Sequence, residues 1–397
     1  MMHLFINSLA ASAGGGLTYT RNVVPHLADL SDVRVTVAVA PRFRAELCQN
    51  SNINFLELET PPARRCWYEQ HMLPNVIRAS KADVLLSAGN FALRRSPVPQ
   101  ILLSRNSIYT SRDYSRDLRS RGEYRMWLDT CARAVLAKKS IAWADVTVAP
   151  SKAFAEELER WTGRKIGVIY HGFDRQAFTQ DTSPFAADVV AKIASTDQSF
   201  KILFVSHYNY YRNFEILIKS LPRLRDRLQG KPVRLLLTCQ LAPGANPGAY
   251  RPDAAARLIE KLGISDMVVE LGTIPYQKLH QLYARADVYV TPAYTETFAH
   301  PLVEAMSSGV PIVASDIPVH REICGDAAFY FERFSPQDLA ERVAQVAERI
   351  DKRESMIATG RARANQFSWK LHAEQIITLA KNLLGRSVTP SAPIVTI

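Results

Sequence analysis

The stretch VYVTPAYTETFAHPLVEAMSSGVPIVA, residues 288 to 314, decides the fold because it holds a strand, a helix and a second strand in succession. Val288–Thr291 and Val310–Ala314 are continuous apolar, β-rich runs, and the segment between them has helical signals. Pro301 suits the first turn of that helix and Gly309 its C-terminal cap. Apolar runs without alternation, joined by a helix, predict parallel strands covered on both faces.

The same alternation of short apolar runs and helical stretches recurs along the chain in two series. The predicted strands are His3–Leu9, Val33–Ala40, Ile53–Leu58, Ala82–Ser87, Gln100–Ser104, Val146–Ala149 and Lys165–Tyr170, then Lys201–Ser206, Val233–Cys239, Met267–Leu271, Val288–Thr291, Val310–Ala314 and Ala327–Phe331. Two such series predict an α/β protein with two Rossmann-like, doubly wound parallel sheets. Because ligands of such sheets lie outside the carboxyl ends of the strands, we expect a site between the two domains.

A polar segment that contains Pro184, residues 181–199, separates the two series and is the predicted hinge. We therefore expect an N-terminal domain over residues 1–182 and a C-terminal domain over residues 183–367. A helix near residues 368–386 is expected to pack back on the first domain. Domain closure about the hinge is expected on ligand binding.

Composition places the chain among globular proteins of a reducing compartment. Of its 397 residues 47% are hydrophobic, and no apolar run approaches the roughly 18 residues of a membrane-spanning helix. The first residues lack the basic leader of a secretion signal, and the five cysteines are scattered without a C-x-x-C pair. We predict a cytoplasmic protein with no metal site and no bound cofactor.

Residues 94–139 carry eleven Lys and Arg against four Asp and Glu, in a chain of net charge +11. A solvated helix surface, an anionic membrane surface or a phosphorylated substrate would each explain this excess. Nucleic acid is the least favoured partner, because no recognised binding motif accompanies the charge. Aromatic residues within Tyr109–Ala144 favour peripheral contact with a membrane. This hypothesis predicts weaker binding to anionic vesicles when Gln replaces four residues, Arg116, Arg119, Arg121 and Arg125.

Two carboxylates in the quoted stretch are candidates for ligand binding. Glu296 falls in the loop after the strand, and Glu304 falls early in the helix. The backbone N–H groups of Phe298, Ala299 and His300 could bind an anion at this point. Carboxylate oxygens accept hydrogen bonds from sugar or ribose hydroxyl groups. The alternative is that both glutamates only complement the helix dipole.

A glycine loop follows the first predicted strand. Gly14, Gly15 and Gly16 precede a helical stretch, so their N–H groups could face an anion, although a simple tight turn explains them equally well. The loop matches neither the G-x-G-x-x-G pattern nor the P-loop.

Several of these segments together resemble the retaining glycosyltransferases of family 4, which have the GT-B fold. Glu296 and Glu304 stand at the spacing of the family's E-x7-E signature, and the glycine loop, Pro150–Phe154, His171–Asp174 and Leu271–Ile274 follow the family's order. The resemblance implies a nucleotide diphosphate sugar as donor, with Glu304 on the ribose hydroxyls and Glu296 near the reactive carbon of the sugar. It further implies that the donor is bound by Thr297, Phe298, Ala299, His300 and Leu302 and flanked at its base by Gly272, Thr273 and Ile274.

The chain departs from the family pattern at two places. Where the family has an arginine and a lysine for the diphosphate, this sequence has His207 and Arg212. A neutral His207 would gain charge only if an adjacent phosphate raised its pKa. Where the family has a histidine near the anomeric carbon, Arg105 and Asn106 stand instead, and neither is a conventional base, so the catalytic base is not assigned.

The resemblance implies hexosyl transfer with retention, in which the leaving diphosphate helps to deprotonate the acceptor hydroxyl and no metal or protein nucleophile takes part. Polysaccharide, glycolipid and glycosylated natural-product synthesis are all compatible, with an acceptor that is lipid-linked, phosphorylated or neither. A sugar-nucleotide epimerase of the same fold and a non-catalytic nucleotide-sugar-binding subunit are the alternatives.

Overall fold

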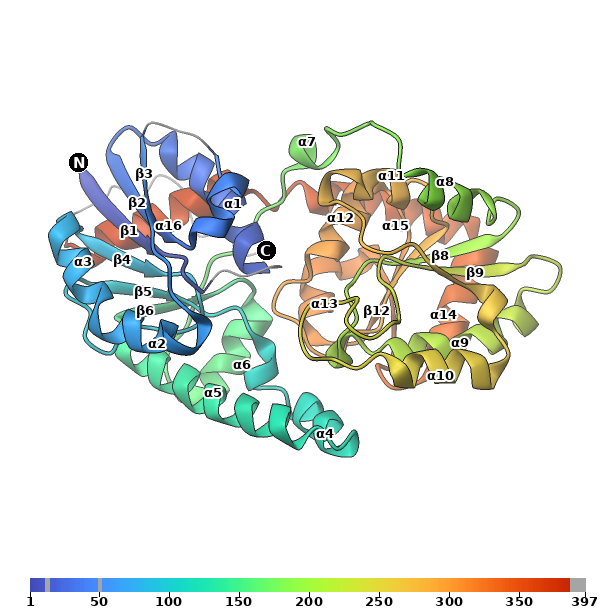
Figure 1. The fold of residues 1–397 in the computed structure, drawn as a ribbon. Helices are drawn as coiled ribbons and strands as arrows, with labels where there is room; N and C mark the ends of the chain where they lie inside the picture. The colour runs from blue at the N-terminus through green and yellow to red at the C-terminus, as the bar shows by residue number, and fades with distance from the viewer. Residues whose placement is uncertain (11–14, 49–51, 386–397) are drawn as a thin grey trace. The chain divides into compact units, whose positions relative to one another are not determined.

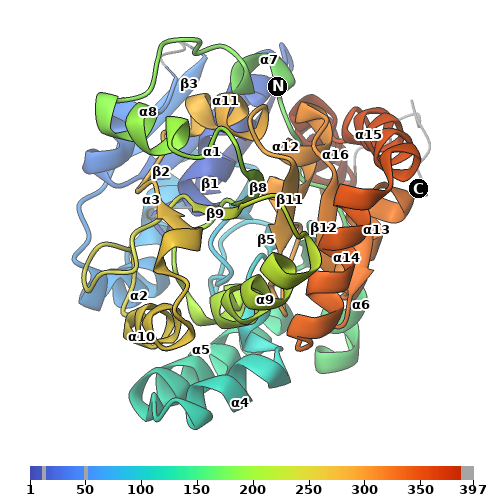
Figure 2. The same cartoon turned by 90° about the vertical axis from the view of Figure 1, so that its right-hand side faces the viewer.

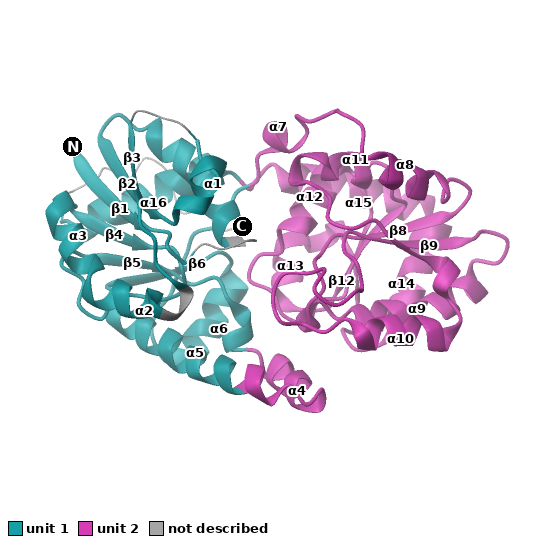
Figure 3. Ribbon diagram, viewed as in Figure 1, with its two compact units in different colours: residues 1–110, 128–172, 368–397 teal, residues 111–127, 173–367 magenta. Residues whose placement is uncertain are grey.

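The computed structural model describes residues 1–10, 15–48 and 52–385, which form two compact units (Figure 3). Unit 1 comprises residues 1–110, 128–172 and 368 onward, and unit 2 comprises residues 111–127 and 173–367. Each unit contains one parallel sheet covered by helices (Figure 1). No helix in the described part of the chain is long and apolar enough to cross a bilayer.

Unit 1 is built on a seven-stranded parallel sheet in the order β3-β2-β1-β4-β5-β6-β7. Its strands are β1 (Met2–Asn7), β2 (Val33–Val39), β3 (Ile53–Glu57), β4 (Val84–Ser87), β5 (Gln100–Leu103), β6 (Val146–Ala149) and β7 (Gly167–Val168). Its helices include α1 (Gly15–Ala28), α2 (Pro62–His71), α3 (Leu73–Ser80), α6 (Lys152–Thr162), α16 (Trp369–Leu383) and most of α5 (Tyr124–Trp143). Side chains of β1, β2, α1 and α16 share one buried apolar cluster, because the strands present continuous apolar runs to both faces.

Unit 2 is built on a six-stranded parallel sheet in the order β10-β9-β8-β11-β12-β13. Its strands are β8 (Phe200–Phe204), β9 (Val233–Leu237), β10 (Val268–Glu270), β11 (Val288–Thr291), β12 (Ile312–Ser315) and β13 (Phe329–Phe331). Helices α9 (Phe214–Arg227), α10 (Asp253–Leu262) and α14 (Pro336–Glu348) lie on one face of this sheet, and α8 (Ala187–Ala194), α11 (Leu279–Tyr283) and α12 (His300–Ser308) lie on the other (Figure 2). Unit 2 also contains α4 (Arg112–Ser120), α7 (Arg175–Phe178), α13 (Pro318–Cys324) and α15 (Ile350–Ala364).

The two parallel sheets predicted from the apolar runs are confirmed. Every predicted strand segment overlaps an observed strand, and β6 and β11 have the predicted bounds. In the quoted stretch, Pro301 lies in the first turn of α12 and the left-handed Gly309, at φ 72°, ends the helix, as expected. Local apolar runs and caps therefore suffice to locate these elements.

The division into units differs from the predicted domain boundaries. The chain leaves unit 1 at residues 172–173, and the segment 181–199 expected as a hinge lies wholly within unit 2. This segment is anchored there because it forms α8, whose Lys192 Nζ donates to the Glu270 carbonyl at 2.9 Å. Residues 111–127, which precede β6 in the sequence, also belong to unit 2.

The strand orders define one point in each sheet where a ligand site is expected. Strand succession reverses between β1 and β4 in unit 1, and between β8 and β11 in unit 2. In open parallel sheets the crevice beyond the carboxyl ends of the two central strands binds ligands. The loops after β8 and β11 in unit 2, together with α12, contain nine of the seventeen predicted site residues.

Candidate functional site

The most buried of the charged residues predicted for the site is Glu304 in α12, which is 4% exposed. The hydroxyl of Tyr283, in α11, donates to Glu304 Oε2 at 3.0 Å and to the Pro301 carbonyl at 3.3 Å. Burial raises the pKa of the Glu304 carboxyl to about 7, although the hydrogen bond from Tyr283 acts in the opposite direction. At neutral pH this carboxyl is therefore poised between its charged and neutral forms.

Ala299 gives the loop before α12 its shape. Its φ is 62°, a left-handed conformation that only a few per cent of non-glycine residues adopt. The residue precedes the first turn of α12, and Leu302 N donates to its carbonyl at 2.9 Å. Backbone strain of this kind, of order 1 kcal/mol, clusters at ligand-binding turns. Leu302 N is thus used within the turn and Pro301 has no N–H group, so the N-terminus of α12 offers an anion its positive dipole end rather than a row of free N–H donors.

Arg212 and Glu296 meet at the switch point of unit 2. Arg212 ends a short 3₁₀ helix after β8 (Tyr210–Arg212), and Glu296 lies in the loop after β11. The Arg212 guanidinium forms an ion pair with Glu296 Oε1, with side-chain exposures of 19% and 9%. Arg212 Nε is buried and has no hydrogen-bond partner among the residues that the structure describes. A guanidinium has five N–H donors, so Arg212 retains capacity for an anion while Glu296 orients it.

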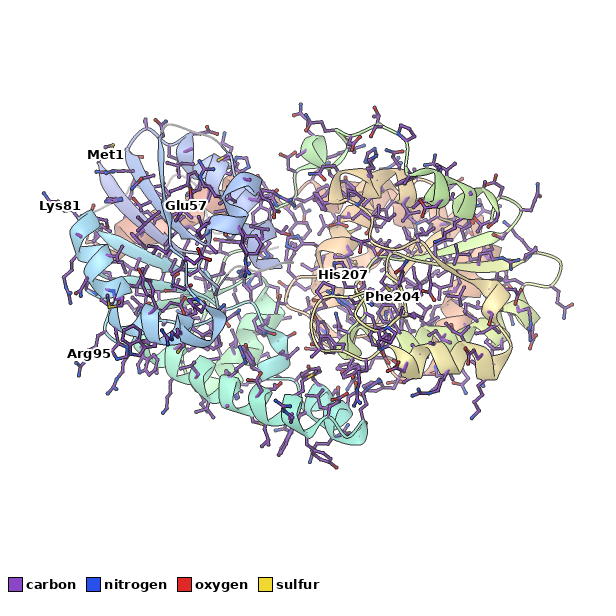
Figure 4. All side chains as sticks on the ribbon, viewed as in Figure 1. Met1, Glu57, Lys81, Arg95, Phe204 and His207 are labelled. Atoms are coloured by element: carbon purple, nitrogen blue, oxygen red, sulfur yellow. The ribbon has the colours of Figure 1, made fainter. Side chains whose placement is uncertain are left out.

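His207 lies in the loop directly after β8, near Phe204 at the end of that strand; both are marked in Figure 4. Its side chain is exposed, and its carbonyl accepts from Ser206 Oγ at 2.7 Å. Partial desolvation first, and then repulsion from the Arg212 guanidinium, lower the pKa of His207 below its ordinary value. Without a bound anion, His207 is therefore neutral at pH 7.

The remaining predicted site residues after β11 differ in how far their side chains are exposed. Phe298, Ala299 and Leu302 have buried side chains, so only their backbone could reach a ligand, whereas Thr297 and His300 are half-buried. The Phe298 ring contacts that of His300 at 4.9 Å between centroids.

The loop predicted to flank the base follows a different strand. Gly272, left-handed at φ 78°, and Thr273, which is exposed, follow β10, and Ile274 beside them is buried. β9 and β8 separate β10 from β11 in the sheet. The structure thus brings Arg212 and Glu296 together.

In unit 1, Arg105 follows β5, and its side chain reaches the loop after β4. Its Nη2 donates to the Ala88 carbonyl at 2.5 Å, its backbone N donates to Asn90 Oδ1 at 2.6 Å, and its guanidinium lies 4.6 Å from the Tyr19 ring centroid. Burial lowers the pKa of Arg105 to about 10, which leaves it charged at neutral pH.

Asn106 has a local structural role in addition to its predicted one. Its Oδ1 accepts from Ile108 N at 3.3 Å and caps a short 3₁₀ helix. In the predicted glycine loop, Gly14 lies outside the described residues, Gly15 begins α1, and Gly16 is half-buried within it.

Two buried polar side chains at these sites escaped the sequence patterns. Tyr283, which contacts Glu304, lies 21 residues earlier in the chain, and no local motif connects them. Glu69 in α2 is 7% exposed and accepts from Asn7 Nδ2 at 3.1 Å at the end of β1. Burial raises the pKa of the Glu69 carboxyl. Both depend on non-local packing, which periodicity does not encode.

The basic stretch is only partly available at the surface. Arg116 has a side-chain exposure of 74%, and Arg119 and Arg125 are also exposed. Arg121, by contrast, pairs with Asp117 at 2.7 Å and with Glu215 at 2.8 Å, which corrects its assignment as a free surface charge.

No group of three or more metal-ligating His, Cys, Asp or Glu side chains is found among residues 1–10, 15–48 and 52–385.

Comparisons with known families assign both halves of the chain to one class of enzymes. The model of "Glycosyltransferase Family 4" matches residues 13–177, and that of "Glycosyl transferases group 1" matches residues 187–363. Together with the fold, these matches show that the chain belongs to glycosyltransferase family 4 and has the GT-B fold.

Solved structures agree in fold over nearly the whole chain. A sucrose-phosphate synthase of Thermosynechococcus elongatus has a TM-score of 0.75 at 17% identity, covering 98% of this chain and 100% of that one. The HepE protein of Anabaena in complex with UDP has a TM-score of 0.71 at 20% identity, covering 96% of this chain and 100% of that one.

Curated relatives match more limited segments. A D-inositol 3-phosphate glycosyltransferase of Corynebacterium aurimucosum is 27% identical over 254 residues, which is 62% of this chain and 59% of that protein. An O-antigen chain mannosyltransferase B of Escherichia coli is 33% identical over 134 residues, 34% of this chain and 35% of that protein. The matched part thus spans less than two thirds of these relatives.

Proposed function

We propose that this protein transfers a hexose-type sugar, with retention, from a nucleotide diphosphate donor to an acceptor hydroxyl. The observation that carries the proposal is the placement of the Arg212–Glu296 pair at the switch point of unit 2, with the buried Glu304 carboxyl in the helix that follows. Family membership and the complexes of the similar Anabaena HepE with UDP and with UDP-glucose support the choice of donor.

The described residues suggest a division of tasks on the donor. Glu304 accepts hydrogen bonds from vicinal ribose hydroxyls, for which its carboxyl has two oxygens. Arg212 and the positive dipole end of α12 stabilise the charge that develops on the departing diphosphate. Glu296 orients the Arg212 guanidinium and lies beside the sugar. Fixed donors of this kind need no reorganisation as the bond breaks.

The acceptor base remains unassigned in this proposal. Arg105 is a buried cation, and Asn106 does not titrate, so neither removes a proton at neutral pH. The leaving diphosphate therefore serves as the base on the same face of the sugar, which also accounts for retention. We further propose that the reaction needs no metal ion, since Arg212 and the N-terminal dipole of α12 supply the positive potential.

Donor binding is the first test. Thermal shift of the full chain with UDP, GDP, ADP and TDP in EDTA should show stabilisation by one nucleotide class. Glu304→Ala should abolish that shift, whereas Glu260→Ala, an exposed glutamate on α10, should retain it. If a folded protein responds to none of the four nucleotides, the proposal is contradicted.

Turnover separates the alternatives that share the fold. A transferase releases nucleoside diphosphate slowly from the donor in water and faster with a suitable alcohol. An epimerase changes the sugar without release, and a binding subunit does neither. The anomeric configuration of the product, read by NMR, tests retention.

The exposed face of α5 favours an acceptor at a membrane surface. Leu128 and Val135 are 59% and 58% exposed at a spacing of seven residues, beside the exposed Lys138 and Lys139. Apolar residues flanked by cations bind anionic lipid. We propose a cytoplasmic protein in peripheral contact with the membrane through this face.

Vesicle binding tests this surface. Sedimentation with phosphatidylglycerol vesicles should fall in the Leu128→Ser/Val135→Ser variant and not in Val190→Ser, a 45% exposed residue of α8. If sedimentation is unchanged, a phosphorylated soluble acceptor is the remaining candidate, which is consistent with the name of the inositol phosphate relatives.

A further inference from the structure

Helix α4 belongs to unit 2 although it lies between β5 and β6 of unit 1 in the sequence (Figure 3). Ser111 caps its N-terminus, and the helix buries Tyr114 and Leu118, which are 1% and 0% exposed. Its polar side chains make contacts with the loops that follow β8, β9, β11 and β13. Of these loops, those after β8 and β11 contain Arg212 and Glu296.

One side chain of α4 contacts the loop that carries Glu296. The hydroxyl of Tyr294 donates to Asp117 Oδ2 at 2.9 Å, and Tyr294 lies two residues before Glu296. Tyr294 is 6% exposed, and burial together with the Asp117 carboxylate holds the pKa of its hydroxyl far above the ordinary value. The hydroxyl therefore remains a donor at every working pH, and its orientation is determined by Asp117.

A second contact reaches the loop that carries Arg212. Tyr294 N donates to the Tyr211 carbonyl at 3.1 Å, so the two loops are joined next to Arg212. The Tyr211 ring meets that of Tyr114 edge-on, with centroids 6.1 Å apart. Thus α4 contacts the immediate neighbours of both members of the ion pair.

A network of charges fixes the C-terminal end of α4. Arg121 donates to Asp117 Oδ1 at 2.7 Å and to Glu215 Oε1 at 2.8 Å, with its guanidinium 4.4 Å from the Tyr210 ring centroid. Glu123 accepts from the Tyr210 hydroxyl at 2.7 Å.

The N-terminal end of α4 is held as well, since Arg333, in the loop after β13, donates to Asp113 Oδ2 at 3.0 Å. Charge-assisted hydrogen bonds at both ends leave α4 little freedom to shift.

We propose that α4 is a positioning element of the donor site, in which Asp117 acts through Tyr294 to hold Glu296 and Arg212 in register. The inference rests on the proposed function of the ion pair as part of the nucleotide-sugar site. Electrostatic groups at a reacting centre lose effect with displacements of about 1 Å. A helix that fixes the neighbours of both charged groups limits such displacement.

The test compares single-atom changes with a control on the same helix. Tyr294→Phe removes only the hydroxyl and retains the ring contact with Phe334 at 5.8 Å. Asp117→Ala removes the acceptor, and Arg112→Gln changes an exposed residue of α4. The dissociation constant of the nucleoside diphosphate and the hydrogen exchange of residues 292–299 are measured for each full-length variant below its unfolding temperature.

We expect Tyr294→Phe and Asp117→Ala each to weaken nucleotide binding about tenfold and to speed exchange in residues 292–299. The double variant should bind no more weakly than Asp117→Ala, because that change already removes the acceptor of the Tyr294 hydroxyl. Arg112→Gln should match the unchanged protein. If α4 only stabilised the fold, Tyr294→Phe and Asp117→Ala would lower the unfolding temperature without altering hydrogen exchange in residues 292–299.

Each outcome decides one of the two proposals. If the unchanged protein binds nucleotide and Tyr294→Phe alters neither affinity nor loop exchange, the positioning role is overturned. If no nucleotide binds the unchanged protein, the proposed function fails, and loop exchange alone then decides whether α4 holds the two loops.

Discussion

Replacing the buried Glu304 carboxyl by its neutral isostere should stabilise the protein in a pH-dependent way. Burial raises the pKa of this group from 4.5 to about 7. The unfolded chain therefore ionises first as pH rises, so the charged group lowers the free energy of unfolding between pH 4.5 and about 7. At about 1.4 kcal/mol per pKa unit, the loss above pH 7 is about 3 kcal/mol.

Glu304→Gln removes this penalty, because an amide does not ionise and its oxygen still accepts from Tyr283. At pH 8 we expect the unfolding transition of unit 2, which contains Glu304, to lie roughly 6–12 °C higher in Glu304→Gln than in the unchanged protein. At pH 4.5 the two should differ by less than about 0.5 kcal/mol, since the carboxyl is then neutral in the folded protein and half-ionised in the unfolded chain. Scanning calorimetry at pH values between 4.5 and 8 measures the difference.

Tyr283→Phe is the matched control, because it removes the hydrogen bond that stabilises the charged carboxyl. In this variant the pKa of Glu304 should be higher still. The free energy of unfolding should therefore begin to fall at the same pH as in the unchanged protein but continue to fall to a higher pH. A Glu304→Gln difference that is constant with pH, or a lower unfolding temperature at pH 8, would refute the reasoning.

Three further predictions follow from single positions. Hydroxyl groups of a nucleotide that donate to Glu304 should lower its pKa, so binding at pH 7 should release about half a proton. The release is measured as a dependence of the calorimetric heat of binding on the ionisation enthalpy of the buffer. Heats that are independent of the buffer would contradict this prediction. Gly172→Ala should reduce stability by about 3 kcal/mol or more in thermal unfolding, because the added Cβ would lie 2.0 Å from Trp369 N. The control Gly163→Ala, whose Cβ would have nothing within 4 Å, should lose only about 1 kcal/mol from its left-handed φ. Equal losses in the two variants would remove the steric argument. Ala299→Gly should change stability by less than about 0.5 kcal/mol. Ala299→Val should lower stability by about 2 kcal/mol, since a β-branched residue is strained at φ 62°. A valine that is tolerated would show that the left-handed turn is absent in solution.

Much of the fold can be predicted from short segments of this chain. Continuous apolar runs such as Val288–Thr291 predict buried parallel strands because both faces of such a sheet are covered. Pro301 and Gly309 likewise predict the bounds of α12, since one suits the first turn and the other the left-handed cap. Family membership was also readable, because the spacing of Glu296 and Glu304 survives within one short segment.

The assembly of the candidate site was decided by tertiary structure. Arg212 and Glu296 lie 84 residues apart and meet only because β8 and β11 are neighbours in the sheet. Arg121 appears in the sequence as one more surface charge, but the docking of α4 on unit 2 pairs it with Glu215. Apolar periodicity specifies which segments are buried, whereas strand order and helix docking depend on contacts between distant segments, which periodicity leaves open.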